Sequence, residues 1–326
     1  MSFRITRREL LPLAGAGLVA GFAGIESRKH RAQAPLPKSR VSISKASSYQ
    51  EDLTLRILEG ARACGLDVTD QKVFVNTQLE GFSANRSTNA DSSVIAATVR
   101  ALRALGAWEI FVGAGPSLER DTVALAEAAG YRDALGDFEK TFVDLNRDDV
   151  NPVEGFQDGI LYLPVAALRA DLIVSIAKMK TDSQLGAALS MENLSGLVPG
   201  SVYGWPKDAA LGSGVDQRSR SIVELARIFR RSFAIVDGIV GMEGNGPLEG
   251  TPKSAGVLVM GDNLAATDAT CCRIMGIDPS RIGYLAQAAG TLSNIEPRQI
   301  DHQGQRPEAV RTDFQLIEEH RALRLG

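Results

Sequence analysis

Three carboxylates, Asp237, Glu243 and Asp268, are the side chains of this sequence best suited to metal or acid–base chemistry. The first two belong to an expected glycine-rich loop at 237–250, where glycines alternate with acid and amide residues after an apolar stretch. Glycines let the backbone approach a ligand, and carboxylate oxygens suit magnesium, calcium or manganese. We predict that the three share one site and bind a divalent metal ion or act as general acid and base. The alternative is a flexible hairpin with solvated carboxylates.

Five further polar residues are candidates for binding a small ligand: Lys178, Lys180, Asn193, Asn245 and Asp262. The two lysines follow an apolar stretch and are placed to meet an anionic group, while the two asparagines are placed to orient it. Each cation or acid also has a structural alternative. The lysines suit a solvated exit from a sheet, and Asp262 suits the cap of the helix that follows it.

Short apolar stretches alternate with amphipathic ones, and these elements must position the candidate residues. Strands are expected at 72–75, 108–112, 141–145, 171–176, 233–237 and 256–260, and helices at 53–64, 94–105, 221–231, 264–275, 280–289 and 314–325, after an extended leader at 35–47. This alternation predicts an α/β fold with a mainly parallel sheet flanked by helices. Ligands bind such sheets beyond the carboxyl ends of the strands, where we expect the cleft.

Two other motifs favour packing over chemistry. Gly113 and Gly115 are half of a dinucleotide-binding fingerprint, but the third glycine is absent and Pro116 intervenes, so a tight strand-to-helix turn is favoured. Cys271 and Cys272 are adjacent on an expected helix, so their side chains point about 100° apart and are expected in the core. Three cysteines are too few for a four-cysteine iron–sulfur cluster, and none is expected within the chain.

Composition excludes several classes of protein. The 326 residues are 44% hydrophobic and 23% charged, as in a globular protein rather than a disordered chain or a multi-span membrane protein. The 36 basic and 39 acidic side chains give a formal net charge of −3. No nucleic-acid partner is expected from these totals.

Residues 1–34 have the pattern of an export signal. Thr-Arg-Arg at 6–8 leads into a small-residue apolar run at 13–25, and Ala-Gln-Ala at 32–34 is a cleavage pattern. The arginine pair resembles the twin-arginine signal, which predicts a periplasmic or otherwise exported protein. A membrane anchor is the alternative, but a span needs about 20 apolar residues, so no stable span is expected after cleavage. Residues 35–326 are expected to form one α/β domain, with a candidate sub-domain boundary near 146–163.

Longer motifs resemble the domain of unknown function 362 family. They are Lys-Met-Lys-Thr at 178–181, Glu-Asn-Leu-Ser-Gly-Leu-Val-Pro at 192–199, the acidic block at 237–247 and the block at 260–279. Members are often exported or fused to ferredoxin-like iron–sulfur domains, which implies redox surroundings, and no ferredoxin module is recognised in this sequence. Asp182 stands where the family usually has histidine, and Glu192 where lysine is common. Whether the family chemistry survives these departures stays open.

Together these patterns predict an exported protein that binds a metal ion or a small anionic ligand in one cleft, with a redox-linked role. A divalent metal ion is the expected cofactor, and a redox protein is the expected macromolecular partner. The alternative is a non-catalytic periplasmic partner or assembly factor for an iron–sulfur or other redox enzyme. Carboxylates near lysines suit proton transfer, and the residues leave both an enzyme and a binding protein open.

Overall fold

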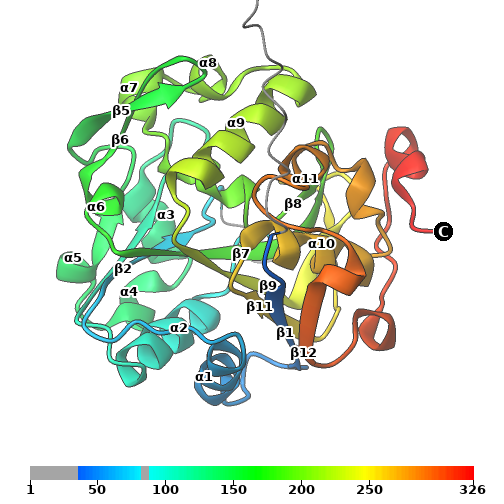
Figure 1. The fold of residues 1–326 in the computed structure, drawn as a ribbon. Helices are drawn as coiled ribbons and strands as arrows, with labels where there is room; N and C mark the ends of the chain where they lie inside the picture. The colour runs from blue at the N-terminus through cyan, green and yellow to red at the C-terminus, as the bar shows by residue number, and fades with distance from the viewer. Residues whose placement is uncertain (1–35, 82–87) are drawn as a thin grey trace, which may run out of the picture. The chain divides into compact units, whose positions relative to one another are not determined.

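Apolar strands and amphipathic helices alternate along the chain, and the computed structural model joins them into one large sheet flanked by helices (Figure 1). The structure describes residues 36–81 and 88–326, so the predicted signal at 1–34 lies outside the described residues. Leu36–Gly326 form one compact unit. The predicted α/β class is confirmed.

The main sheet has ten strands, eight of which follow one another in the order β12-β1-β11-β9-β7-β2-β3-β4. Its strands are β1 (Ser39–Lys45), β2 (Lys72–Thr77), β3 (Glu109–Ala114), β4 (Phe142–Asp144), β7 (Leu172–Asp182), β8 (Gly186–Ala188), β9 (Ser232–Glu243), β10 (Thr251–Lys253), β11 (Val257–Gly261) and β12 (Ile300–Gly304). The run β9-β7-β2-β3-β4 is parallel throughout. The strand β11 is antiparallel to both of its neighbours, and β8 and β10 add short antiparallel pairs to β7 and β9.

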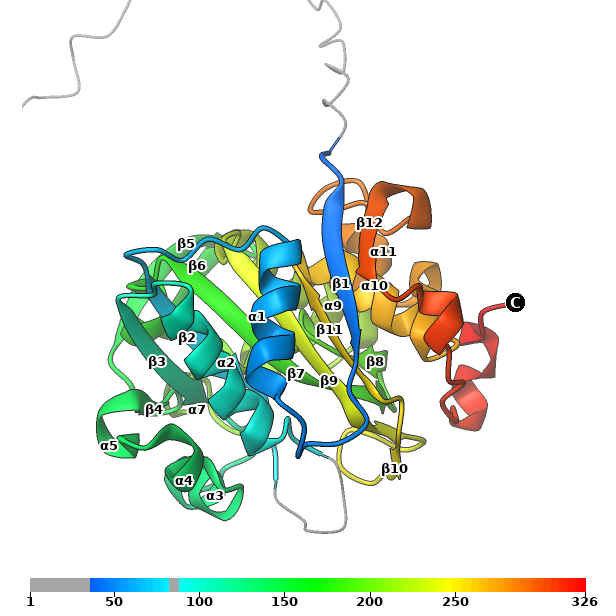
Figure 2. The same ribbon diagram turned by 90° about the horizontal axis from the view of Figure 1, so that it is seen from below.

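Helices cover both faces of the sheet. Figure 2 shows α1 (Leu53–Ala63) and α2 (Ser92–Ala104) across one face, with α9 (Val215–Ile228), α10 (Leu264–Ile274) and α11 (Gly283–Ala288) on the other. Two apolar clusters fill the two layers, because alternate residues of each strand point to opposite faces. The short helices are α3 (Thr122–Ala128), α4 (Tyr131–Leu135), α5 (Phe138–Thr141), α6 (Val165–Leu168), α7 (Gly200–Tyr203) and α8 (Asp208–Leu211).

Side-chain caps explain where several helices begin. Asp52 accepts a hydrogen bond from the N–H of Leu55 at the start of α1, and Asn263 accepts one from Ala266 at the start of α10. Each cap satisfies one of the backbone donors that the first helical turn leaves free. Asp262 was the alternative candidate for this cap, but its neighbour Asn263 caps the helix.

Two predicted segments differ from the structure, and the candidate boundary region has a structure of its own. Residues 35–47 contribute the strand β1, in which Val41 and Ile43 are buried between β11 and β12. The end of the chain forms a 3₁₀ helix, η5 (Glu318–Leu323), rather than a helix over 314–325. The region at 146–163 contains most of a separate two-stranded hairpin, β5 (Val150–Phe156) and β6 (Gly159–Pro164).

The strand β9 continues through the segment predicted to be a glycine-rich loop. Gly238 and Gly241 lie within β9, and a Cβ at Gly238 would come within 2.8 Å of the Met179 Cε atom on the neighbouring β7. A Cβ at Gly241 would meet the backbone oxygen of the same methionine. These glycines therefore allow two strands to approach closely, and Asp237 lies inside the sheet rather than at the end of a strand.

Candidate functional site

A cavity of about 230 Å³ opens at the carboxyl ends of β2, β3 and β7. This is the edge of a parallel sheet at which ligands usually bind. Segments after β2 and β3, the end of β7, the 3₁₀ helix η1 (Glu192–Leu197), the start of α9 and the turn after β9 supply its walls. Its charged lining residues are Glu80, Lys180, Asp182, Glu192, Lys207 and Arg218.

Lys180 is completely buried, and its side chain lines this cavity. Among the described residues, its ammonium group donates only to the carbonyl oxygen of Thr88, at 3.4 Å. Burial lowers the pKa of the lysine, because the charged form loses its hydration. Nearby carboxylates, led by Glu80 and Glu192, oppose that shift without forming a close ion pair. The sequence prediction placed Lys180 at a ligand site, and the structure places it at the cavity.

Lys207 is a second buried lysine on the cavity wall, with 2% of its surface exposed. Its Nζ atom donates to the carbonyl oxygens of Gly115, at 2.8 Å, and Gly196, at 3.5 Å. Burial lowers the pKa of Lys207 to about 8. Sequence reasoning missed this residue, because it lies in an irregular stretch before α8 with no periodic pattern or recognisable motif around it.

Two of the acids on the wall are held by local hydrogen bonds. Both oxygens of Glu80 accept from Ser117, one from its N–H and one from its hydroxyl, at 2.9 Å each. Asp182 uses a single oxygen, Oδ1, to accept from the N–H groups of Gln184 and Leu185, at 2.8 and 2.7 Å. Sequence reasoning missed Glu80, although its position shortly after the strand β2 was a usable signal.

Glu192 is the third acid, and it faces a cation and an amide. Its carboxylate lies 3.7 Å from Nη2 of Arg218, and it accepts from the Gln78 amide at 3.4 Å. Its side chain is only 13% exposed. Burial raises the pKa of Glu192, while Arg218 and Lys180 lower it less strongly.

Asp268 fixes the segment that carries Glu192. It is fully buried, and it accepts from the N–H and hydroxyl of Ser190, at 2.9 and 2.5 Å, and from the N–H of Met191, at 2.9 Å. Burial raises the pKa of Asp268 to about 7, against the opposing effect of these hydrogen bonds. Asp268 therefore acts through the backbone next to Glu192 and not in the cavity itself.

Asn193 fixes the same segment from the other side. Its amide nitrogen donates to the backbone oxygens of Asn76 and Ile176 and to the hydroxyl of Ser175, at 2.9 to 3.2 Å. The side chain thus binds the end of β2 and the middle of β7, and it does not offer its amide to the cavity as predicted. The segment at 190–193 is consequently tied to α10 through Asp268 and to the sheet through Asn193.

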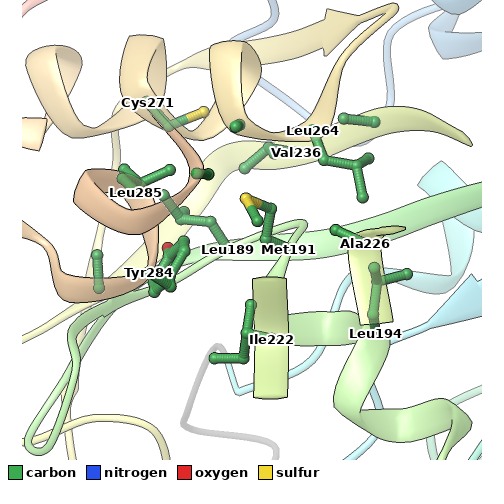
Figure 3. Close-up of a cluster of buried hydrophobic side chains, with 14 of the residues drawn as sticks. Leu189, Met191, Leu194, Ile222, Ala226, Val236, Leu264, Cys271, Tyr284 and Leu285 are labelled. Carbon is green, nitrogen blue, oxygen red and sulfur yellow. The ribbon is translucent and has the colours of Figure 1, made fainter. Parts of the chain in front are cut away.

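An apolar cluster packs against the segment that carries Glu192. Figure 3 shows Leu189, Met191 and Leu194 packed among side chains of α9, α10 and α11, including Ile222 and Tyr284. Cys271 belongs to the same cluster, as predicted for a core cysteine, and Cys272 is also fully buried. Close packing of this kind leaves the backbone at 189–194 few alternative positions.

Asp237 pairs with Lys178 in the interior of the sheet. Nζ of Lys178 lies 2.6 Å from Asp237 Oδ2 and also donates to the hydroxyl of Tyr49, at 3.0 Å. Asp237 further accepts from the Tyr49 hydroxyl and from the N–H groups of Asp91 and Ile239. Neither residue lines the cavity and both side chains are buried, so this ion pair is a structural element outside it.

The remaining predicted site residues are dispersed. Glu243 accepts from the N–H of Gln315, at 2.8 Å, and lies 3.6 Å from the ammonium of Lys253. Asn245 donates to Glu249 within its own turn, at 3.0 Å. Asp262 accepts from the N–H and guanidinium of Arg40 on β1, at 2.9 and 3.3 Å, and so ties β1 to the end of β11.

The predicted three-carboxylate metal site is therefore not formed. Asp237, Glu243 and Asp268 each satisfy a different part of the backbone, and each is buried among different neighbours. Over residues 36–81 and 88–326, no three His, Cys, Asp or Glu side chains are grouped so that they could hold a metal ion. The same ranges contain no helix long and apolar enough to cross a membrane.

Comparisons with known proteins extend the resemblance seen in the motifs. Thylakoid-associated protein sll1697 of Synechocystis sp. (strain ATCC 27184 / PCC 6803 / Kazusa) is 27% identical over 252 residues, or 76% of this chain and 77% of that protein. The lactate racemase apoprotein of Thermoanaerobacterium thermosaccharolyticum is similar in structure, with a TM-score of 0.49 and 12% identity over 74% of this chain and 57% of that one. A protein from Thermotoga maritima has a TM-score of 0.42 and 14% identity over 67% and 56%.

The family assignment rests on a sequence model rather than on these structures. The model described as domain of unknown function (DUF362) matches residues 73–273, which include β2 to β9 and most of α10. The cavity residues from Gln78 to Leu248 all lie inside the matched region. The chain belongs to the DUF362 family.

Proposed function

We propose that this protein binds a small organic ligand with an anionic group, a carboxylate or a phosphate, in the cavity at the carboxyl ends of β2, β3 and β7. The observation that carries the proposal is Lys180, a completely buried lysine on the wall of that cavity. Its ammonium group has one protein acceptor among the described residues, and that acceptor is 3.4 Å away.

A buried ammonium group is costly unless it is paired and hydrogen-bonded. Lys180 can donate three hydrogen bonds, so the single long contact leaves donors for a ligand. Lys207 lies on the same wall and adds a second buried cation. Charge-assisted hydrogen bonds from two such lysines to an oxyanion are stronger than neutral ones. The cavity is small, so we expect the ligand to be a small molecule rather than a polymer.

Titration calorimetry tests this proposal with the full chain and four probes: acetate, propionate, succinate and inorganic phosphate. We expect at least one probe to bind, and the variant Lys180→Met to bind it at least tenfold more weakly. Lys140→Met is the matched control, because Lys140 lies on the surface beside Asp137. Equal affinity in the two variants, or no binding of any probe to the unmodified protein, would overturn the proposal.

Proton transfer to a bound ligand is the second candidate function. It is favoured by a specific observation, since burial lowers the pKa of Lys180 and raises that of Glu192 on the same wall. A lysine and a carboxyl group shifted in these directions are better suited than unshifted ones to act as base and acid. Exchange of carbon-bound hydrogen for deuterium in a bound probe, followed by proton NMR in heavy water, tests it. A Glu192→Gln variant that exchanges at the unmodified rate would contradict it.

Export and a redox setting complete the proposal. Its support is the Thr-Arg-Arg pattern at 6–8, the cleavage pattern at 32–34 and the association of related chains with ferredoxin-like domains. Fusing residues 1–34 to a reporter should send it to the periplasm, and Arg7→Lys with Arg8→Lys should retain it in the cytoplasm. A non-catalytic role beside a periplasmic redox enzyme is favoured only if the fusion is exported and the calorimetry shows no ligand.

A further inference from the structure

Among the residues that the structure describes, the cavity lining is balanced in charge: three cationic side chains, Lys180, Lys207 and Arg218, face three carboxylates, Glu80, Asp182 and Glu192. We infer that the ligand carries a protonated amine as well as an anionic group, and is therefore a small zwitterion such as an amino acid. This inference rests on the proposed function, because it names the class of ligand for the same cavity. An anionic ligand alone would use the lysines and leave the acceptor capacity of Asp182 and Glu192 unused.

Asp182 supplies the first partner for an amine. It lies two residues after Lys180 on β7, so both side chains leave the strand on the same face. Its Oδ1 atom holds the turn that follows, through the N–H groups of Gln184 and Leu185. No donor among the described residues contacts Oδ2. A cavity-lining carboxylate with one oxygen committed and one available can accept from an ammonium group.

Glu192 supplies the second partner. The contacts of its carboxylate with Arg218 and Gln78 are long, at 3.7 and 3.4 Å, so neither is a close charge-assisted bond. Burial raises the pKa of Glu192, and a ligand ammonium nearby would favour the ionised form instead. Glu80 is less available, since each of its oxygens already accepts from Ser117. Asp182 and Glu192 are therefore the groups left for an amine.

The balance of charge on the cavity wall also favours a zwitterionic ligand. A mono-anion that enters a wall with equal numbers of fixed positive and negative groups adds one uncompensated charge in a partly buried place. Such a charge is costly. A zwitterion adds none, and its two ends can each find an opposite partner, on the lysine side and on the carboxylate side. Electrostatic complementarity of this kind is a source of specificity.

Matched pairs of probes test the inference by calorimetry at constant pH and ionic strength. Each pair shares a carbon chain and differs in the amine: glycine with acetate, alanine with propionate, and aspartate with succinate. We expect at least one amino acid to bind tenfold or more tightly than its partner acid. Asp182→Asn keeps the Oδ1 acceptor for the turn and removes the charge, so it should shrink that preference, with the affinity for the acid kept or increased.

Glu192→Gln is the second variant, for the case in which Asp182→Asn does not fold. Asp133→Asn, on the exposed side of α4, is the surface control and should keep the full preference. If acids bind through Lys180 but amino acids bind no better, the inference is overturned while the proposed function stands. If neither class binds, both are overturned. If the preference persists unchanged in both cavity variants, the assignment of the amine to Asp182 and Glu192 is overturned.

Discussion

Lys178 and Asp237 form an ion pair inside the main sheet, with 2.6 Å between Nζ and Oδ2 and exposed fractions of 2% and 0%. They lie on neighbouring parallel strands, β7 and β9, at positions that face each other in the register. Tyr49 donates to Asp237, accepts from Lys178 and therefore adds the segment before α1 to the pair. The three residues join parts of the chain that are far apart in sequence.

Loss of one partner of this pair should be strongly destabilising. We expect Asp237→Ala to lower the free energy of unfolding by about 3–5 kcal/mol, because it leaves the buried ammonium of Lys178 unpaired. Urea unfolding followed by circular dichroism measures the change. The double variant Lys178→Met with Asp237→Leu should recover much of the loss, because an apolar pair of similar volume needs no hydration. Asp137→Ala, from an exposed pair, should change little, and an equal loss there would contradict the role of burial.

Asp268 should make stability depend on pH. Its pKa in the folded protein is raised to about 7 by burial, above the value of about 3.9 for an unfolded aspartate. Between these values the folded state holds a proton that the unfolded state has released. The contribution of this group to stability should therefore be greatest below pH 4, fall as the pH rises towards 7, and then level off, with a slope of at most about 1.4 kcal/mol per pH unit.

Urea midpoints measured from pH 4 to pH 8.5 check this dependence. The variant Asp268→Asn cannot titrate, so it should lose the descending part of the curve between pH 4 and 7. It should also weaken binding of any cavity probe, because the segment at 190–192 loses an acceptor for its N–H groups. An unchanged slope in the variant would show that another group titrates in this range.

Lys207 should give ligand binding an upper pH limit. Burial lowers its pKa to about 8, so the lysine loses its charge as the pH rises through that value. The affinity for an anionic probe such as propionate should fall above pH 8 for this reason. Calorimetry from pH 6.5 to pH 9.5 checks it, and Lys207→Met should bind more weakly at pH 7 and show a smaller decline. If the affinity of the variant declines as much as that of the unmodified protein, a group other than Lys207 causes the decline.

Lys207 should affect stability and ligand affinity in opposite directions as the pH rises. An unfolded lysine keeps its proton up to about pH 10.4, whereas the buried one releases it near 8. The unfolded state thus binds more protons between these values, and stability from this group rises with pH there. The loss of affinity above pH 8 should therefore occur without unfolding, which circular dichroism at each pH verifies.

Gly115 should be sensitive to a single added methyl group. A Cβ at this position would meet the carbonyl oxygen of Gly196 in η1 and come within 3.0 Å of the Lys207 ammonium. We expect Gly115→Ala to cost about 1–3 kcal/mol of stability and to weaken binding of the anionic probes. Gly159→Ala is the control, because its Cβ would meet only the Phe156 carbonyl oxygen at an ordinary 3.5 Å. Equal effects of the two substitutions would contradict the close approach.

Much of the fold was predictable, because hydrophobic periodicity is a local signal. The strands at 72–75, 108–112 and 171–176 were expected near where β2, β3 and β7 are found. β7 extends to Asp182 through polar residues that its own pattern does not mark as buried. Their burial depends on distant partners, as the contact of Lys178 with Asp237 illustrates.

The candidate site was predictable only in part. Lys180 was expected near an anionic ligand, and it lines the cavity. Asp268 and Asn193 were expected to contact a ligand directly, but their hydrogen bonds hold the segment that carries Glu192. The glycines after Asp237 suggested a loop, and they serve the contact between β7 and β9 instead. Lys207 had no local signal.

The sequence by itself determined the α/β alternation, the family motifs and the set of side chains able to bind charge or move protons. The tertiary structure decided which of those side chains share an environment. It placed Lys180, Lys207, Asp182 and Glu192 around one cavity and gave Asp237, Glu243 and Asp268 separate structural partners. The physical reason is that a buried polar group must be satisfied by neighbours, and in a parallel sheet those neighbours come from strands and helices far away in the chain.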